Sequence, residues 1–218
     1  DLSTIKNNGR GIVMLGEHND DGDLRFKKKL KINFPCSILS ILLNNFTIKL
    51  FNNFYFLKET NSLTVVDLEK YFYPLDKIKN WNLLYGKRGF IQYQFLLPEE
   101  NIIENIKILI NKFYQLGLIS YLSVLKKMGK KNKNLLSFPD EGFALALDIK
   151  NKPGLEKSIN ILDNFLVNIG GRVYLTKDSL INEENFKKSY PNWNKFQMIR
   201  DKYKAKIFKS NQSIRIGL

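Results

Sequence analysis

Cysteine and histidine are nearly absent from this chain of 218 residues, which has one of each, Cys36 and His18. A single cysteine excludes an internal disulfide bond and a cysteine-based metal cluster. A lone histidine leaves no second imidazole to complete a metal site, and no serine–histidine relay is indicated around it. We therefore predict no bound metal, and we interpret His18 as a structural residue at the end of a strand.

Long apolar runs and glycine-rich phosphate loops are lacking too. The most apolar region, Phe34 to Phe56, is interrupted by Pro35 and Lys49, and it falls short of the roughly 20 apolar residues that span a bilayer. No glycine-rich loop follows a predicted strand, so the usual dinucleotide-binding signature is not found. Because the chain begins with Asp1 and not with Met, we expect a leader or a whole domain upstream.

Acidic residues are the minority charge, with 21 Asp and Glu against 35 Lys and Arg, for a net charge of +14. Such an excess invites a nucleic-acid interpretation. The lysines are spread among many Asn and Ile residues, however, and their two clusters, 27–29 and 126–133, are not interleaved with aromatic residues as a single-strand binding surface would be. We predict no nucleic-acid partner and keep a basic nucleic-acid- or membrane-surface-binding module as the weaker alternative.

The hydrophobic patterns predict an α+β fold. Alternating segments indicate strands at 11–17, 24–32, 90–97, 119–125 and 142–149. Helical spacing indicates helices within 37–56, at 99–116 and at 153–168. The aromatic-rich stretch 71–85 is typical of a loop.

Two of the strands have faces that suggest a binding site. Gln92 and Gln94 alternate with apolar side chains, so their amides lie on one face of the strand, where they would suit the hydroxyls of a sugar or the edge of a flat heterocycle. An ordinary half-solvated strand is the alternative. On the strand 142–149, Ala144 and Ala146 share the face opposite the apolar one, which leaves either room for a shallow pocket or a surface on which a helix packs tightly.

Several short blocks then closely resemble one family in order and approximate spacing, from about Gly9 to the C-terminus. The blocks are Tyr73-Pro74-Leu75-Asp76, Trp81-Asn82, Tyr85-Gly86, Gly89 to Phe95, Leu136 to Pro139, Gly170 to Tyr174 and Lys177-Asp178-Ser179. They resemble the decaprenylphosphoryl-β-D-ribose 2′-oxidases, members of the vanillyl-alcohol-oxidase-like, FAD-linked oxidases. The resemblance implies an antiparallel sheet with helices packed on one face, which forms a substrate-binding domain over 1–172. A helical C-terminal segment, 173–218, would return to an FAD-binding domain that is missing upstream, so this fragment alone would bind FAD poorly and be inactive.

The resemblance also implies the chemistry and the residues. It implies oxidation of the 2′-hydroxyl of a polyprenyl-phospho-ribose with hydride transfer to FAD, in the epimerisation of a cell-envelope precursor. Lys177 and Tyr174 would be catalytic, Gln92, Gln94, Lys126, Phe72, Ala144 and Ala146 would bind substrate, and Lys177 and Gln94 would contact the flavin. An ordinary lysine is protonated near neutral pH, so we favour a charged role for Lys177.

The implied partner is an NADH-dependent short-chain reductase, and the implied location is the cytoplasm, with peripheral association at the inner membrane. Two departures concern the substrate: Ala144 and Ala146 stand where mycobacterial members have Asn and Cys, and Phe72 stands where Tyr is usual. These departures put the identity of the sugar in doubt. An aldonolactone or alditol oxidase of the same superfamily is the alternative enzyme.

Overall fold

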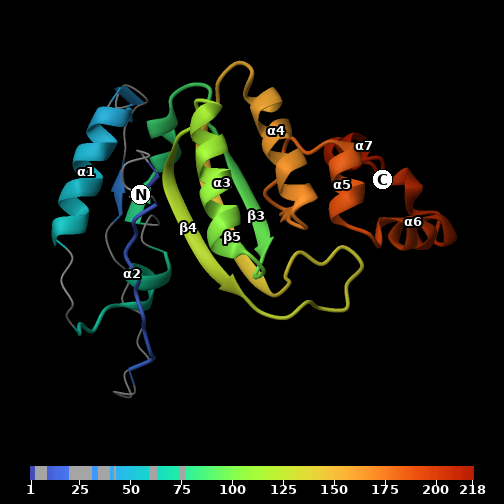
Figure 1. The fold of residues 1–218 in the computed structure, drawn as a ribbon, viewed down its shortest axis with the longest axis horizontal. Coiled ribbons are helices and arrows are strands. Elements are labelled where there is room, and N and C mark those ends of the chain that lie inside the picture. Colours follow the sequence, from blue (N-terminus) through green and yellow to red (C-terminus); the bar gives the residue numbers. More distant parts are fainter. Residues whose placement is uncertain (3–8, 20–30, 34–39, 42, 59–62, 74–76) are drawn as a thin grey trace. The chain divides into compact units, whose positions relative to one another are not determined.

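A computed structural model describes residues 1–2, 9–19, 31–33, 40–41, 43–58, 63–73 and 77–218. These residues form two compact units, one made of 10–89 and the other of 1–9 together with 90–218. Figure 1 labels the helices and strands of both units. Each unit is described by itself.

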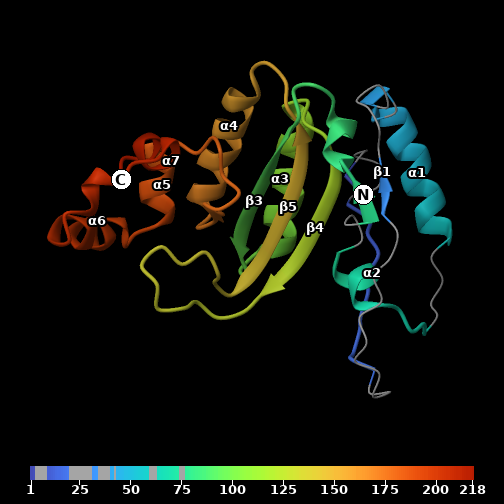
Figure 2. The same ribbon diagram turned by 180° about the vertical axis from the view of Figure 1, so that it is seen from behind.

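The larger unit is built on an antiparallel sheet of four strands in the order β4-β5-β3-β6. The strands are β3 (Phe90–Pro98), β4 (Ser120–Met128), β5 (Gly142–Lys150) and β6 (Arg172–Val173). Two helices, α3 (Ile102–Gln115) and α4 (Leu155–Asn168), lie over one face, and Figure 2 shows the opposite face in front of them. The α+β prediction, with an antiparallel sheet and helices on one face, is confirmed.

The core of this unit follows from the alternation of its strands. Tyr93 and Phe95 of β3 point to the helix-covered face, as do Leu145 and Leu147 opposite them on β5, and all four are buried. The helices meet them with side chains at helical spacing, namely Leu109 and Phe113 of α3 and Leu155, Ile159, Leu162 and Leu166 of α4. The alternation of the strand residues and the spacing of the helix residues therefore bury the same face of the sheet.

One carboxyl group lies inside this core. Asp163 of α4 is 1% exposed, and its Oδ1 accepts a hydrogen bond of 2.6 Å from the hydroxyl of Tyr93. Burial raises the pKa of Asp163 to about 7, although the hydrogen bond from Tyr93 acts in the opposite direction. Asp163 is therefore protonated in the folded protein at acidic pH, where the unfolded chain would already be ionised.

The buried acid predicts that the protein loses stability as the pH rises from 4 to 7. The folded state holds a proton there that the unfolded state has released, so the free energy of unfolding falls by at most roughly 1.4 kcal/mol per pH unit. Asp163→Asn should remove most of this slope, and urea unfolding of both proteins at pH 5 and pH 8 measures it. An equal slope in the variant would show that Asp163 is ionised in the fold.

The C-terminal segment is helical, as predicted. It contains α5 (Glu183–Ser189), α6 (Trp193–Lys202), the 3₁₀-helix η5 (Ala205–Ile207) and α7 (Asn211–Arg215). Asn182 caps α5 by accepting a hydrogen bond from the amide of Asn185, and Ser210 and Ser213 form a reciprocal capping box at the start of α7. Such caps satisfy amides that the first turn leaves without partners.

The smaller unit has little sheet. A short parallel pair joins β1 (Ile32–Asn33) to β2 (Ile78–Lys79), and the unit also contains α1 (Asn45–Lys58), α2 (Leu68–Phe72) and the 3₁₀-helix η4 (Trp81–Tyr85). The predicted helix within 37–56 is thus found from 45 onward, whereas part of the predicted loop 71–85 is helical. Among the described residues, no helix is long and apolar enough to cross a membrane.

The strand predicted at 11–17 was wrong, and most of the one predicted at 24–32 lies outside the described residues. Residues 11–17 have no regular structure, and Val13 and Leu15 are 85% and 93% exposed. A strand-like sequence forms a strand where a neighbour completes its ladder, and β-propensity alone does not supply one. His18 follows this irregular segment and is exposed, so it does not end a strand.

Candidate functional site

The face of the sheet opposite the helices collects most of the predicted site residues. The register of β4, β5 and β3 places side chains on this face in three rows. The rows are Leu122–Asp148–Gln92, Val124–Ala146–Gln94 and Lys126–Ala144–Leu96. The two amides, the two alanines and Lys126 come from three different strands, and the register brings them to one surface, here called the open face.

The turn that carries Tyr174 and Lys177 lies beside the same face. The amide of Tyr174 donates to the carbonyl of Gln94 at 2.8 Å, and the amide of Lys177 donates to the carbonyl of Tyr174 at 3.0 Å. Because β6 runs antiparallel to β3, the chain from Arg172 to Tyr174 proceeds from the Leu96 row to the Gln94 row, where the turn over 175–177 begins. The Lys177 side chain is exposed there.

A close packing position leads into this turn. A Cβ atom at Gly171 would collide with the side chain of Leu166 and with the carbonyl oxygen of Leu96. Glycine is therefore needed for α4 and β3 to approach β6 at this point. Gly171 thus has a packing role directly before the candidate residues.

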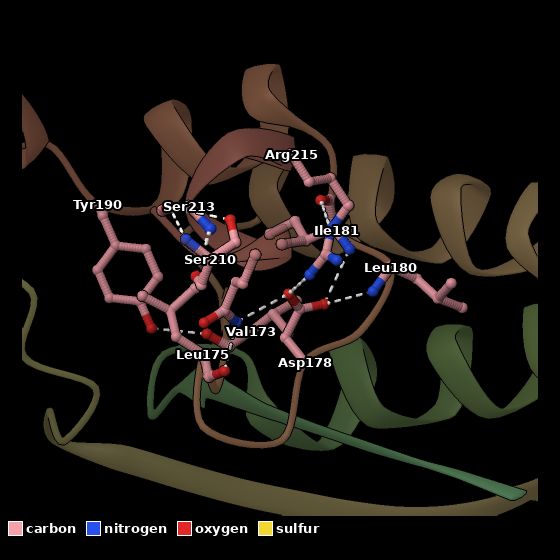
Figure 3. A network of polar contacts seen from close by, with 10 residues as sticks. Val173, Leu175, Asp178, Leu180, Ile181, Tyr190, Ser210, Ser213 and Arg215 are labelled. Carbon is pink, nitrogen blue, oxygen red and sulfur yellow. Dashed lines mark hydrogen bonds and ion pairs between the residues drawn. The ribbon is translucent and has the colours of Figure 1, made fainter. Parts of the chain in front are cut away.

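Asp178 anchors the turn from its C-terminal side, as Figure 3 shows. Its Oδ1 accepts from the amides of Leu180 and Ile181, both at 2.8 Å, and its Oδ2 accepts from Arg215 at 2.6 Å and Gln212 at 3.3 Å. The side chain of Asp178 is 3% exposed. The last helix of the chain therefore fixes the loop that follows Lys177.

Hydrogen bonds from Tyr190 and Arg172 hold β6 itself. The hydroxyl of Tyr190 donates to the carbonyl of Val173 at 2.6 Å (Figure 3). Arg172 donates to the carbonyl of Ser137 at 3.1 Å and pairs with Asp140 at 2.9 Å. The Tyr190 bond ties β6 to the end of α5, and the Arg172 contacts tie it to the segment that precedes β5.

The two alanines differ in what covers them. Ala144 is 1% exposed and packs in a small cluster with Leu96 and Phe138, which Tyr174 contacts. Phe138 and Tyr174 have ring centroids 4.4 Å apart. Ala146 is half-buried. An aromatic side chain from the preceding loop thus fills the space above Ala144, whereas Ala146, beside Gln94, keeps part of its surface open.

Asp148 is a site residue that the sequence did not reveal. It stands opposite Gln92, is 1% exposed, and accepts a hydrogen bond of 2.9 Å from the Gln92 amide. Burial raises the pKa of Asp148, while the bond from Gln92 and the charge of Lys177 lower it. The signal was present in the alternation of 142–149, where a carboxylate shares a face with the two alanines, but burial could not be read from it.

Two of the predicted site residues, Lys126 and Phe72, have exposed side chains. Lys126 is exposed at the edge strand β4, on the open face. Phe72 belongs to the smaller unit, at the end of α2, where it is 56% exposed. The structure therefore brings Gln92, Gln94, Lys126, Ala144, Ala146, Tyr174 and Lys177 to one region of the larger unit, whereas Phe72 belongs to the smaller unit.

Comparison with known proteins identifies a relative that matches most of the chain. Over 178 residues, 81% of this chain, the sequence is 34% identical to decaprenylphosphoryl-β-D-ribose oxidase of Mycolicibacterium smegmatis. The chain is a relative of the decaprenylphosphoryl-β-D-ribose oxidases. The matched part is 38% of that oxidase, so the chain spans well under half the length of its relative.

A second match is to an uncharacterized protein of the mprA 5′ region in Streptomyces coelicolor, 31% identical over 104 residues, which are 47% of this chain and 28% of that protein. No family model matches the chain. The relation to decaprenylphosphoryl-β-D-ribose oxidase confirms the resemblance drawn from the sequence blocks.

The residues of the open face fit the polar edge of a flavin or a sugar. A buried carboxylate oxygen, Oδ2 of Asp148, has no hydrogen-bond partner among the described residues, and the amide of Gln94 and the ammonium of Lys177 supply donors on the same side of the sheet. Ala146 stands opposite Gln94 on β5 and presents a small side chain there. Donors, an acceptor and space therefore occur together, as a ligand rich in hydroxyl or amide groups requires.

Proposed function

We propose that this chain is the substrate-binding part of an FAD-dependent oxidoreductase that oxidises a secondary hydroxyl of a sugar, the 2′-hydroxyl of a polyprenyl-phospho-ribose. The observation that carries the proposal is the gathering of Gln92, Gln94, Tyr174 and Lys177 on one face of the sheet in a chain related to decaprenylphosphoryl-β-D-ribose oxidase. FAD, when bound, would accept the hydride that leaves the alcohol carbon.

The residues of this chain would bind and orient the alcohol. The amides of Gln92 and Gln94 each offer two donors and an acceptor to sugar hydroxyls. Gln92 already donates to Asp148, which leaves its carbonyl oxygen for a ligand hydroxyl. The exposed ammonium of Lys177 would stabilise negative charge that develops on the oxygen as its proton leaves.

Two residues limit the size of the ligand. Phe138 and Tyr174 pack over Ala144 and exclude water from that side, so the ligand would lie over Ala146. Since Ala146 has no polar group, it cannot select one sugar epimer by a hydrogen bond. We expect the contacts from Gln94 and Lys177 to carry more of the selectivity.

The wider assignment follows the same relation. We propose that FAD is bound mainly by a part of the full-length protein that this chain does not contain, with Lys177 and Gln94 at the flavin. We further propose that the keto sugar passes to an NADH-dependent short-chain reductase, and that the full-length protein works in the cytoplasm with peripheral contact to the inner membrane. The domain limits 1–172 and 173–218 belong to this proposal.

A flavin titration tests the proposal directly. This chain alone should quench FAD fluorescence weakly, whereas the full-length protein should bind FAD stoichiometrically and then oxidise a polyprenyl-phospho-ribose. Weak binding by the chain is expected because no glycine-rich phosphate loop occurs in it. Stoichiometric binding of FAD by the isolated chain would contradict the proposal that FAD is bound mainly outside it. A full-length protein without flavin would contradict the oxidoreductase assignment.

A further inference from the structure

The carboxylate of Asp148 is only half satisfied. Its Oδ1 accepts the hydrogen bond from Gln92 at 2.9 Å, whereas Oδ2 is buried and has no hydrogen-bond partner among the described residues. A buried acceptor without a donor costs free energy, so native proteins retain one where something else supplies the donor. The donor has to come from a group on or beside the open face.

Three cations on or beside the open face must be compared as donors to Asp148. Lys150 follows Asp148 by two positions on β5, Lys126 lies two rows away on β4, and Lys177 lies on the turn that begins at Tyr174, beside the Gln94 row. It is the charge of Lys177 that acts on Asp148 and lowers its pKa.

Other charged groups near this turn are already engaged. Arg172 pairs with Asp140 at 2.9 Å. Asp178, next to Lys177 in the chain, pairs with Arg215 at 2.6 Å and accepts two backbone amides. Asp148 and Lys177 are therefore the carboxylate and the cation best placed to form an ion pair.

We propose that Asp148 is a positioning residue, which holds the ammonium of Lys177 over the open face. Gln92 fixes the carboxylate through Oδ1, and Oδ2 accepts from the ammonium. The role of this pair in catalysis rests on the proposed function. A sugar hydroxyl bound over Ala146 would lie beside a Lys177 ammonium whose position Asp148 fixes. The pairing itself does not depend on the reaction.

Carboxyl ¹³C NMR titration of this chain tests the pairing without any activity. Lys177→Gln should raise the pKa of Asp148 by about 0.5 to 1, because the opposite charge that favours the ionised form is gone. Lys150→Gln is the matched control and should leave it unchanged. Because Lys177 is exposed, the variant should fold normally. An unchanged pKa in Lys177→Gln, or an equal rise in Lys150→Gln, would overturn the proposal.

Kinetics of the full-length flavoprotein test the role of the pair. Asp148→Asn should lower kcat about tenfold, as expected for loss of orientation, while KM and bound FAD change less than about twofold. Lys150→Gln should behave as the parent protein does. If Asp148→Asn keeps full turnover, the positioning role is wrong. A parent protein that oxidises no sugar would contradict the proposed function, whereas the NMR titration would still decide the pairing.

Discussion

Replacing Lys177 by alanine in the full-length protein is expected to reduce sugar oxidation by about 100-fold to 1,000-fold. Loss of one preorganised group that stabilises developing negative charge has an effect of this size in other enzymes. Lys177 is exposed and lies on a turn whose backbone is fixed by hydrogen bonds at Tyr174 and Asp178. The loss should therefore appear in kcat, with little change in stability.

The matched control for this prediction is Lys127→Ala. Lys127 pairs with Glu99 at 3.2 Å on the surface and stands on the opposite face of β4 from Lys126. Removing it subtracts the same charge from the same unit without touching the open face. Steady-state turnover and the rate of flavin reduction should be measured for both variants. Equal rates in Lys177→Ala and the parent protein would show that Lys177 has no role in the reaction.

The second large effect concerns stability. Asp178→Ala should lower the free energy of unfolding by about 3 kcal/mol, the lower end of what the breaking of a buried ion pair costs. The side chain of Asp178 is 3% exposed and receives hydrogen bonds from two backbone amides, Arg215 and Gln212 (Figure 3). Its loss leaves the two amides without an acceptor and releases α7 from the turn after Lys177.

Urea unfolding of this chain measures that cost, with Glu184→Ala as the control. Glu184 pairs with Lys188 at 2.7 Å between exposed side chains, and such surface pairs contribute little. The midpoint of Glu184→Ala should therefore stay close to that of the parent protein. A similar midpoint for Asp178→Ala would show that the last helix does not stabilise the turn.

The alternation of apolar residues was enough to predict the central strands and the faces on which their side chains lie. Gln92 and Gln94 are on the opposite face from Tyr93 and Phe95, as the period of two requires. The helices α3 and α4 were predicted for the same reason, since their apolar residues recur at a spacing that a helix brings to one side. Both patterns are local in the sequence, so they can be recognised without knowledge of the fold.

Predictions that needed a partner from elsewhere in the chain did not follow from the sequence. Residues 11–17 have a strand-like pattern but no regular structure, because a strand needs a neighbour to complete its ladder. The pattern of alanines likewise left two outcomes open. The structure decides between them separately for each, since Phe138 covers Ala144 while Ala146 remains half-buried.

The sequence by itself thus determined the α+β class, the polar face of β3 and the relation to the decaprenylphosphoryl-β-D-ribose oxidases. The tertiary structure decided that Asp148 stands opposite Gln92 and is buried with one oxygen unmatched among the described residues, and that α7 holds the turn behind Lys177 through Asp178 and Arg215. Register between distant strands and the docking of a terminal helix both depend on contacts between residues far apart in the chain. Local periodicity carries no information about such contacts, because it repeats identically whichever partner the strand or helix meets.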